Sequence, residues 1–169
     1  AADGHHVVVH AGRNVDVAQA LVREIAAAGA SAEAIAFDVA DRAAAAAVLA
    51  TLLEDGPIQI LVNNAGIHAD AVFPGMSGAQ WDSVLDVSLN GFFNVTQPLT
   101  LPMLRTRWGR IINITSVAAL AGNRGQVNYS AAKGALHAAT KSLALELASR
   151  GVTVNAVAPG IIATGMSGG

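Results

Sequence analysis

Short runs of β-branched residues alternate with longer alanine- and leucine-rich segments along almost the whole chain, and this alternation constrains the fold most. The short runs have the length of strands, whereas the long segments have the period of amphipathic helices. Strands that alternate with helices predict a parallel sheet covered on both faces. We predict strands at 7–9, 34–37, 58–62, 111–114 and 152–157.

The helical segments carry local start and stop signals. Asp41 is placed to cap a helix that runs to about residue 53, and Gly29 ends the preceding one. Pro98 and Pro102 are expected to kink or interrupt the second half of the longest helix. The predicted helices span 15–28, 42–53, 80–104 and 128–148.

Composition limits the classes of function. A chain of 169 residues with 53% hydrophobic residues fits a single domain with a sizeable core, and we treat 1–169 as that domain. The net charge of −2 favours neither nucleic acid nor an anionic membrane as a partner. The absence of cysteine excludes disulfides and thiolate metal sites, and the five histidines match no metal motif. Without a signal peptide or a spanning apolar run, we expect a soluble, cytoplasmic protein.

Most predicted strands end in small or polar residues. Because parallel strands end at one edge of a sheet, and open α/β sheets bind ligands there, these turns predict a binding edge. Any one of them could equally be an ordinary turn. The residues concerned are Asp38, Asn63 to Gly66, Thr115 and Ser116, and Pro159 and Gly160.

Tyr129 and Lys133 are four residues apart on one predicted helix, so they share a face about one turn apart. An ammonium group near a phenol favours the phenolate, which lets the phenol exchange a proton with a substrate oxygen. Tyr129 is the only tyrosine, and Ser116 lies thirteen residues before it at the end of a strand. A serine hydroxyl there could stabilise charge on a carbonyl oxygen, although it could also cap a turn.

These motifs occur in the order and spacing of the short-chain dehydrogenase/reductase family, which the chain resembles over nearly its whole length. The stretch from Gly122 to Tyr129 is most similar to the 3-oxoacyl-(acyl-carrier-protein) reductases of that family. The resemblance implies a doubly wound, Rossmann-like sheet and hydride transfer between NAD(P)H and a carbonyl carbon. It also implies a homodimer or homotetramer, and the apolar circumference of residues 131–148 suits burial against a second subunit.

The same resemblance implies roles for individual residues. Tyr129 would be the general acid, Ser116 would polarise the carbonyl group, and Lys133 would tune Tyr129 and hold the ribose of the nicotinamide. The other implied contacts to the cofactor are Asn63, Ala65 and Gly66 along the dinucleotide, Asp38 and Val39 at the adenine, and Pro159, Gly160, Ile162 and Thr164 near the carboxamide.

The chain departs from the family pattern at two places. Ser88 stands where the family has a catalytic asparagine that holds a water molecule, so we expect a slower enzyme rather than an inactive one. The glycine-rich turn that carries the pyrophosphate is also absent, as are the first strand and the last strand. We therefore expect a longer polypeptide, and a sheet without its central strand should split its first two strands from the rest.

Cofactor and carrier preferences depend on three arginines. After the first strand, where relatives that prefer NAD carry an acid, this chain has Arg13, so NADP(H) is favoured and NAD(H) is the alternative. Arg107 and Arg150 lie where related reductases present arginines to the acidic carrier protein, and both could instead be ordinary solvated residues.

We expect the reduction of a 3-oxoacyl group attached to a carrier protein. The first alternative is a family reductase that acts on another small alcohol or ketone. The second is a catalytically impaired, structural relative, which the missing glycine-rich turn favours and the complete set of Ser116, Tyr129 and Lys133 opposes.

Overall fold

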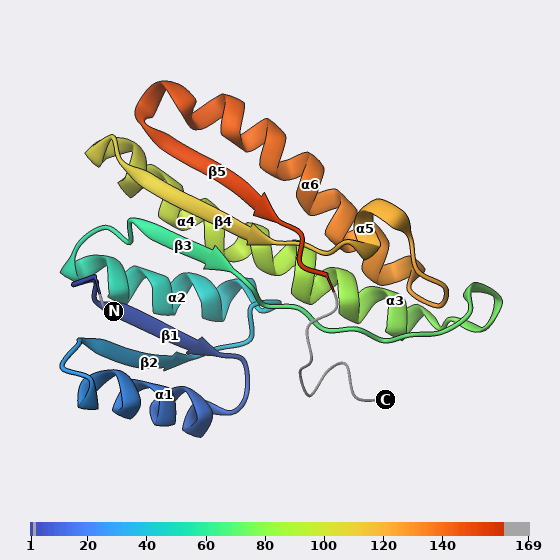
Figure 1. Ribbon diagram of the computed structural model, residues 1–169, viewed down its shortest axis with the longest axis horizontal. Helices are drawn as coiled ribbons and strands as arrows, with labels where there is room; N and C mark the ends of the chain where they lie inside the picture. The colour runs from blue at the N-terminus through green and yellow to red at the C-terminus, as the bar shows by residue number, and fades with distance from the viewer. Residues whose placement is uncertain (2, 161–169) are drawn as a thin grey trace.

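The strands of the protein form two parallel sheets, and the computed structural model describes residue 1 and residues 3–160 (Figure 1). The sheet order is β1-β2 in one and β3-β4-β5 in the other, and the arrows of all five strands point the same way in Figure 1. The predicted split of the first two strands from the rest is therefore confirmed. The strands are β1 (Val7–Ala11), β2 (Ala32–Ala36), β3 (Ile60–Asn63), β4 (Gly109–Ile114) and β5 (Val152–Val157).

Helices connect the strands as the sequence pattern predicts, and short helical turns extend several of the connections. The helices are α1 (Val15–Ala27), α2 (Arg42–Leu52), α3 (Gly78–Leu85), α4 (Gly91–Thr106), α5 (Ala118–Ala121) and α6 (Val127–Leu147). The short turns are η1 (Leu53–Asp55), η2 (Phe73–Gly75), η3 (Asp86–Asn90) and η4 (Ala148–Arg150).

Local signals account for where the helices begin and end. The Asp41 carboxylate accepts the backbone N–H groups of Ala43 and Ala44, as expected for a capping residue. Gly29 follows α1 with a φ of 80°, which only glycine adopts without strain. Ser77 begins α3 in a reciprocal capping box with Gln80, which the sequence analysis missed.

The three-stranded sheet is buried on one face. Leu61, Ile111 and Val154 are paired across the strands, and all three are buried in the core against α4 and α6. Their neighbours on the opposite face are open, since Ile60 is 39% exposed and Val62 is 52% exposed. The prediction that helices cover both faces is therefore wrong for this sheet in the part of the chain that the structure describes.

The predicted long helix is interrupted, but not at its prolines. Pro98 and Pro102 both lie inside α4, which continues through them. The break falls earlier, at η3, a single π-helical turn that separates α3 from α4 and contains Ser88. Turns of this kind widen a helix locally and are frequent at functional sites. The interruption predicted at the prolines is therefore wrong, and the irregularity lies at a predicted site residue.

A small joint ties the β1-β2 pair to the rest of the molecule. Asn94 on α4 donates its amide N–H to the carbonyl oxygen of Val39 at 2.9 Å and accepts the Arg42 guanidinium at 3.0 Å. Val39 also packs against Gly91, where an added Cβ would lie only 2.8 Å from a methyl group of Val39. The segment that follows β2 is therefore held against α4 by these contacts.

Candidate active site

The carboxyl ends of β4 and β5 are fastened together. Thr115 donates both its backbone N–H and its hydroxyl to the carbonyl oxygen of Val157, at 2.8 and 3.0 Å. Two residues further on, the N–H of Val117 donates to the carbonyl oxygen of Pro159 at 3.2 Å. Ser116 therefore lies between two fixed points at the edge of the sheet where we predicted ligand binding.

Lys133 reaches this edge from α6. Its side chain is only 3% exposed, and Nζ donates to the carbonyl oxygen of Ile114 at 2.8 Å. Nζ also lies 5.8 Å from the centre of the Tyr129 ring, within the range of a cation–π contact. Burial lowers the pKa of Lys133, because the charged form loses hydration. The structure thus brings the predicted amine and phenol together.

Tyr129 lies in the first turn of α6 and is partly exposed. Its backbone N–H donates to the side-chain oxygen of Asn128 at 2.8 Å. Among the described residues the phenol hydroxyl has no protein hydrogen bond, so it can still meet a ligand.

Ser116 forms the turn cap that its sequence position allows, and its predicted role toward a carbonyl oxygen stays a prediction. Its Oγ accepts the backbone N–H of Ala118 at 3.1 Å, which is a turn cap. Because the oxygen accepts this bond, the hydroxyl proton remains free to donate to another group. The carbonyl oxygen of Ala118 in turn accepts the Ser130 hydroxyl at 3.1 Å, which joins the serine turn to α6 next to Tyr129.

Gly66 and Ser88 line the space around the Lys133 ammonium group. An added Cβ on Gly66 would lie 3.1 Å from Nζ and 3.7 Å from Ser88 Oγ, so glycine leaves room there that a side chain would fill. Ser88 is 2% exposed, and its hydroxyl has no hydrogen-bond partner among residues 1 and 3–160. A buried hydroxyl without a partner is costly, so this position is suited to a further small polar group.

A buried polar network supports this edge from below. Asn63 donates its amide to Thr96 Oγ1 and to Asn113 Oδ1, each at 2.9 Å, and Asn113 donates to Thr140 Oγ1 at 2.8 Å. These four residues come from β3, α4, β4 and α6. The amide N–H groups of Asn63 are therefore engaged inside the protein, which leaves its side-chain oxygen and its backbone for the predicted contact to a cofactor.

The residues predicted at the adenine end are spread over exposed turns. Arg13 and Asp38 are exposed, and the Asp38 carboxylate accepts the backbone N–H of Ala40 at 2.9 Å. The Val39 side chain is buried in the core with Phe37, so its side chain is not presented to a ligand. Ala65 and Gly160 are exposed, and Ile162 and Thr164 lie outside the described residues.

Sequence reasoning missed two buried asparagines that organise the site. Asn113 and Asn128 are both 0% exposed, and each forms hydrogen bonds to residues from other elements. The position of Asn128 directly before Tyr129 was the one available signal. No comparable signal marked Asn113, which lies in an otherwise apolar strand.

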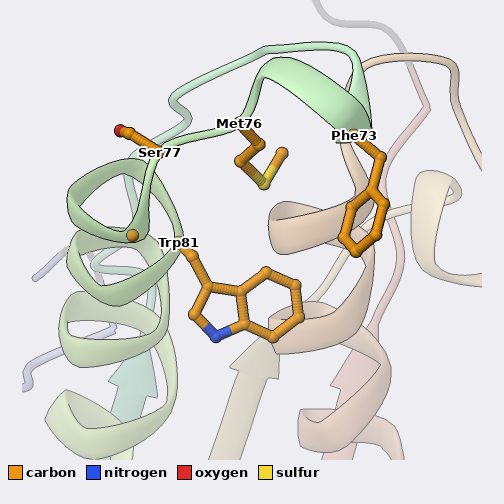
Figure 2. A pocket seen from close by; sticks show the side chains of 5 residues that line it. Phe73, Met76, Ser77 and Trp81 are labelled. Carbon is orange, nitrogen blue, oxygen red and sulfur yellow. The ribbon is translucent and has the colours of Figure 1, made fainter.

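A shallow pocket of about 270 Å³ lies between η2 and α3 (Figure 2). Phe73, Met76 and Trp81 give it an apolar lining, and the Trp81 ring forms one wall in Figure 2. None of its lining residues is one of those predicted to carry chemistry.

Within residues 1 and 3–160, acidic side chains and histidines form no group of three or more able to ligate a metal ion. None of the helices in that part of the chain combines the length and the hydropathy needed to cross a bilayer.

Comparison with known proteins identifies the class. The sequence profile of the family described as short chain dehydrogenase matches residues 1–169. The chain belongs to the short-chain dehydrogenase family, as predicted, and the Rossmann-like fold class is confirmed by the structural comparison below.

Individual relatives narrow the resemblance. The chain is 48% identical over 168 residues to a 3-oxoacyl-(acyl-carrier-protein) reductase of Synechocystis, covering 99% of this chain and 68% of that protein. The protein of the same name from Aggregatibacter actinomycetemcomitans is 45% identical over 163 residues, covering 95% of this chain and 67% of that one. A gluconate 5-dehydrogenase of Burkholderia cenocepacia was solved with NADP and tartrate, and it superposes on this chain with a TM-score of 0.90 at 34% identity. The match covers 95% of this chain and 63% of the gluconate 5-dehydrogenase chain. The chain thus spans about two thirds of the length of these relatives.

Proposed function

We propose that the protein is an NADP(H)-dependent oxidoreductase that reduces the carbonyl group of a 3-oxoacyl chain carried by an acyl carrier protein. The observation that carries this proposal is the buried Lys133 ammonium group between the Ile114 carbonyl oxygen and the Tyr129 ring. The identity to two reductases of that name supports the substrate, and the neighbour solved with NADP supports the cofactor.

Each residue of the site would perform a separate part of the reaction. The Ser116 hydroxyl, whose proton is free, would donate to the substrate carbonyl oxygen and stabilise the charge that develops on it. The Tyr129 phenol would then give its proton to that oxygen, and the nearby ammonium group of Lys133 would stabilise the phenolate that remains. The cofactor supplies the hydride for the carbonyl carbon.

The residues present fit the nicotinamide half of the cofactor. Lys133 has three N–H donors and uses one for Ile114, so two remain for ribose hydroxyl groups. Gly66 leaves open the space beside them that a Cβ would fill. At the other end of the dinucleotide, Arg13 is exposed and would be available to a 2′-phosphate.

The direct test follows NADPH absorbance with the full-length protein and an acetoacetyl thioester, with Tyr129→Phe as the control. Steady oxidation of NADPH that disappears in the control is the expected result. Activity on simple ketones or sugars but not on the thioester would favour the other type of reductase. No turnover with any carbonyl substrate would favour a structural relative. Arg13→Glu should raise the KM for NADPH more than that for NADH.

Arg107 and Arg150 lie at the opposite end of β4 and β5 from the site. Both are exposed, and the Arg107 guanidinium donates to the carbonyl oxygen of Ser149, which places it beside Arg150. Within the described residues neither forms a salt bridge with an acidic side chain. We propose that an acidic carrier protein docks on Arg107 and Arg150. Reversing the charge of both arginines should raise the KM for the carrier-linked substrate and leave the KM for a small thioester unchanged.

Two exposed leucines on α4 and α6 bear on how the protein assembles. Leu101 on α4 and Leu145 on α6 are 54% and 83% exposed, and a second subunit packed on these helices would cover both. We propose a homodimer or homotetramer in the cytoplasm. Sedimentation of the full-length protein tests the assembly, and Leu145→Glu should shift it toward the monomer.

A further inference from the structure

The segment from Ala69 to Ala71, which we call the strap, is bonded to the turn before α6. The backbone N–H of Ala71 donates to the carbonyl oxygen of Gly125 at 2.9 Å. The Gln126 side chain donates to the Asp70 carboxylate at 2.8 Å, and it accepts from Asn123 at 2.9 Å. The other oxygen of Asp70 lies 3.4 Å from Nδ1 of His68.

Asn128 makes the buried part of the same connection. Its amide donates to the carbonyl oxygens of Ala69 and Gln80, each at 3.0 Å. Its side-chain oxygen accepts the backbone N–H of Tyr129 at 2.8 Å. One fully buried side chain therefore links the strap and α3 to the residue that carries the phenol.

The first turn of α6 needs this support because it has no side-chain cap. Gln126 precedes the helix, but its side chain forms no capping bond and is engaged with Asp70 and Asn123 instead. An uncapped first turn leaves unsatisfied N–H groups and frays easily. Tyr129 lies in that turn, so the position of its phenol depends on whatever holds the turn in place.

The chain that leads into the strap passes close to Lys133. Gly66 lies three residues before Ala69, at the place where an added Cβ would meet the Lys133 ammonium group. One short stretch of chain therefore contacts the surroundings of the amine at one end and the turn carrying the phenol at the other.

We propose that the strap positions the Tyr129 phenol for proton transfer, with Asp70, Gln126 and Asn128 as positioning residues. This inference rests on the proposed function for its activity readout. The Asp70–Gln126 bond is its testable part, because both side chains lie near the surface and can be changed without burying a charge.

The experiment exchanges the two partners in the full-length protein. Gln126→Glu places a carboxylate against that of Asp70 and breaks the bond by repulsion. Asp70→Asn alone keeps an oxygen that Gln126 can donate to. The double variant, Asp70→Asn with Gln126→Glu, restores a hydrogen bond of reversed direction. Gln19→Glu on the exposed face of α1 makes the same chemical change far from the site and serves as the matched control.

We expect Gln126→Glu to lower kcat about tenfold, with NADPH affinity and Tm close to wild type. Asp70→Asn, the double variant and the control should stay within about threefold of wild type. The inference is overturned if Gln126→Glu keeps full kcat or if the double variant is no better than Gln126→Glu. It is also overturned if the loss is matched by an equal loss of NADPH affinity or of folded protein.

A spectroscopic readout separates this inference from the proposed function. The ring signals of ¹³C-labelled tyrosine, assigned with Tyr129→Phe, should move in Gln126→Glu and return in the double variant. If the wild type shows no turnover but the signals follow this pattern, the proposed function fails and the strap stands. Signals that do not change in Gln126→Glu would overturn the strap whatever the activity.

Discussion

The two sheets of the molecule hold the residues at their carboxyl ends in different ways. At the end of β3-β4-β5, Asn63, Asn113 and Lys133 are bonded to residues from neighbouring elements, and the last two are buried. At the end of β1-β2, Arg13 and Asp38 lie on exposed turns. The difference supports a proposed site whose reacting end is preorganised, whereas the residues proposed for the far end of the dinucleotide are less constrained.

The attachment of the two sheets to each other shows the same contrast. The three-stranded sheet shares one core with α2, α4 and α6, which includes Leu99, Met103 and Ile111. The β1-β2 pair is joined to it through a second cluster of only three buried residues, Phe37, Val39 and Ala45, and through the contacts of Asn94. Regions with few buried apolar contacts open most easily, so amides of β1 should exchange with solvent faster than those of β4.

The largest effect is expected at the preorganised end. Tyr129→Phe removes the proton donor and leaves the ring that packs near Lys133, so kcat should fall about 1,000-fold while NADPH affinity changes little. Stopped-flow measurement of hydride transfer, together with a fluorescence titration of NADPH, would check both parts. A variant that kept more than about a tenth of wild-type kcat would remove Tyr129 from its assigned role.

The next largest effect is expected at Asn94, which joins the β1-β2 pair to the rest of the molecule. Asn94→Ala leaves the Val39 carbonyl oxygen without its donor and the Arg42 guanidinium without its acceptor. The free energy of unfolding should fall by about 1–3 kcal/mol, and amide exchange should accelerate more in β1 than in β4. Urea denaturation and hydrogen exchange measure the two quantities. Uniform acceleration in both sheets would show that Asn94 stabilises the whole molecule rather than the joint.

A smaller effect is expected from Lys133, whose contribution to the free energy of unfolding depends on pH. Because burial lowers its pKa below the ordinary value of 10.5, the unfolded chain binds more protons in the window between the two pKa values. The contribution of Lys133 to the free energy of unfolding therefore rises with pH across that window, by at most about 1.4 kcal/mol per pH unit. Lys133→Met should flatten the rise, which urea denaturation at a series of pH values up to 10.5 would show. Parallel curves for the two proteins would contradict the assignment.

Much of the fold was predictable because its signals are local. The β5 boundaries, the Asp41 cap and the glycine after α1 follow from residue types at short spacing, and the structure has all three. The proximity of Tyr129 and Lys133 was predictable because the two residues share a helix face, which fixes their separation whatever the surroundings.

The remainder depends on tertiary contacts that short spacing does not encode. Asn113 is buried in an apolar strand because Asn63 and Thr140, fifty and twenty-seven residues away, satisfy its amide. The π turn at Ser88 replaces the break expected at the prolines, and it has no local residue signature. The open face of β3 also escaped prediction, since an apolar strand has the same pattern whether one face or both are covered.

The smallest expected effect concerns the hydroxyl of Ser88, a buried group at the preorganised end to which the described residues offer no hydrogen-bond partner. An amide offers both donors and an acceptor, so Ser88→Asn should hold a water molecule near Lys133 more firmly than serine does. We expect kcat to rise about threefold, with NADPH affinity unchanged. Ser88→Ala is the matched control, because it removes the hydroxyl without adding volume, and it should lower kcat. Turnover that stays the same or falls in Ser88→Asn would show that serine already completes this part of the site.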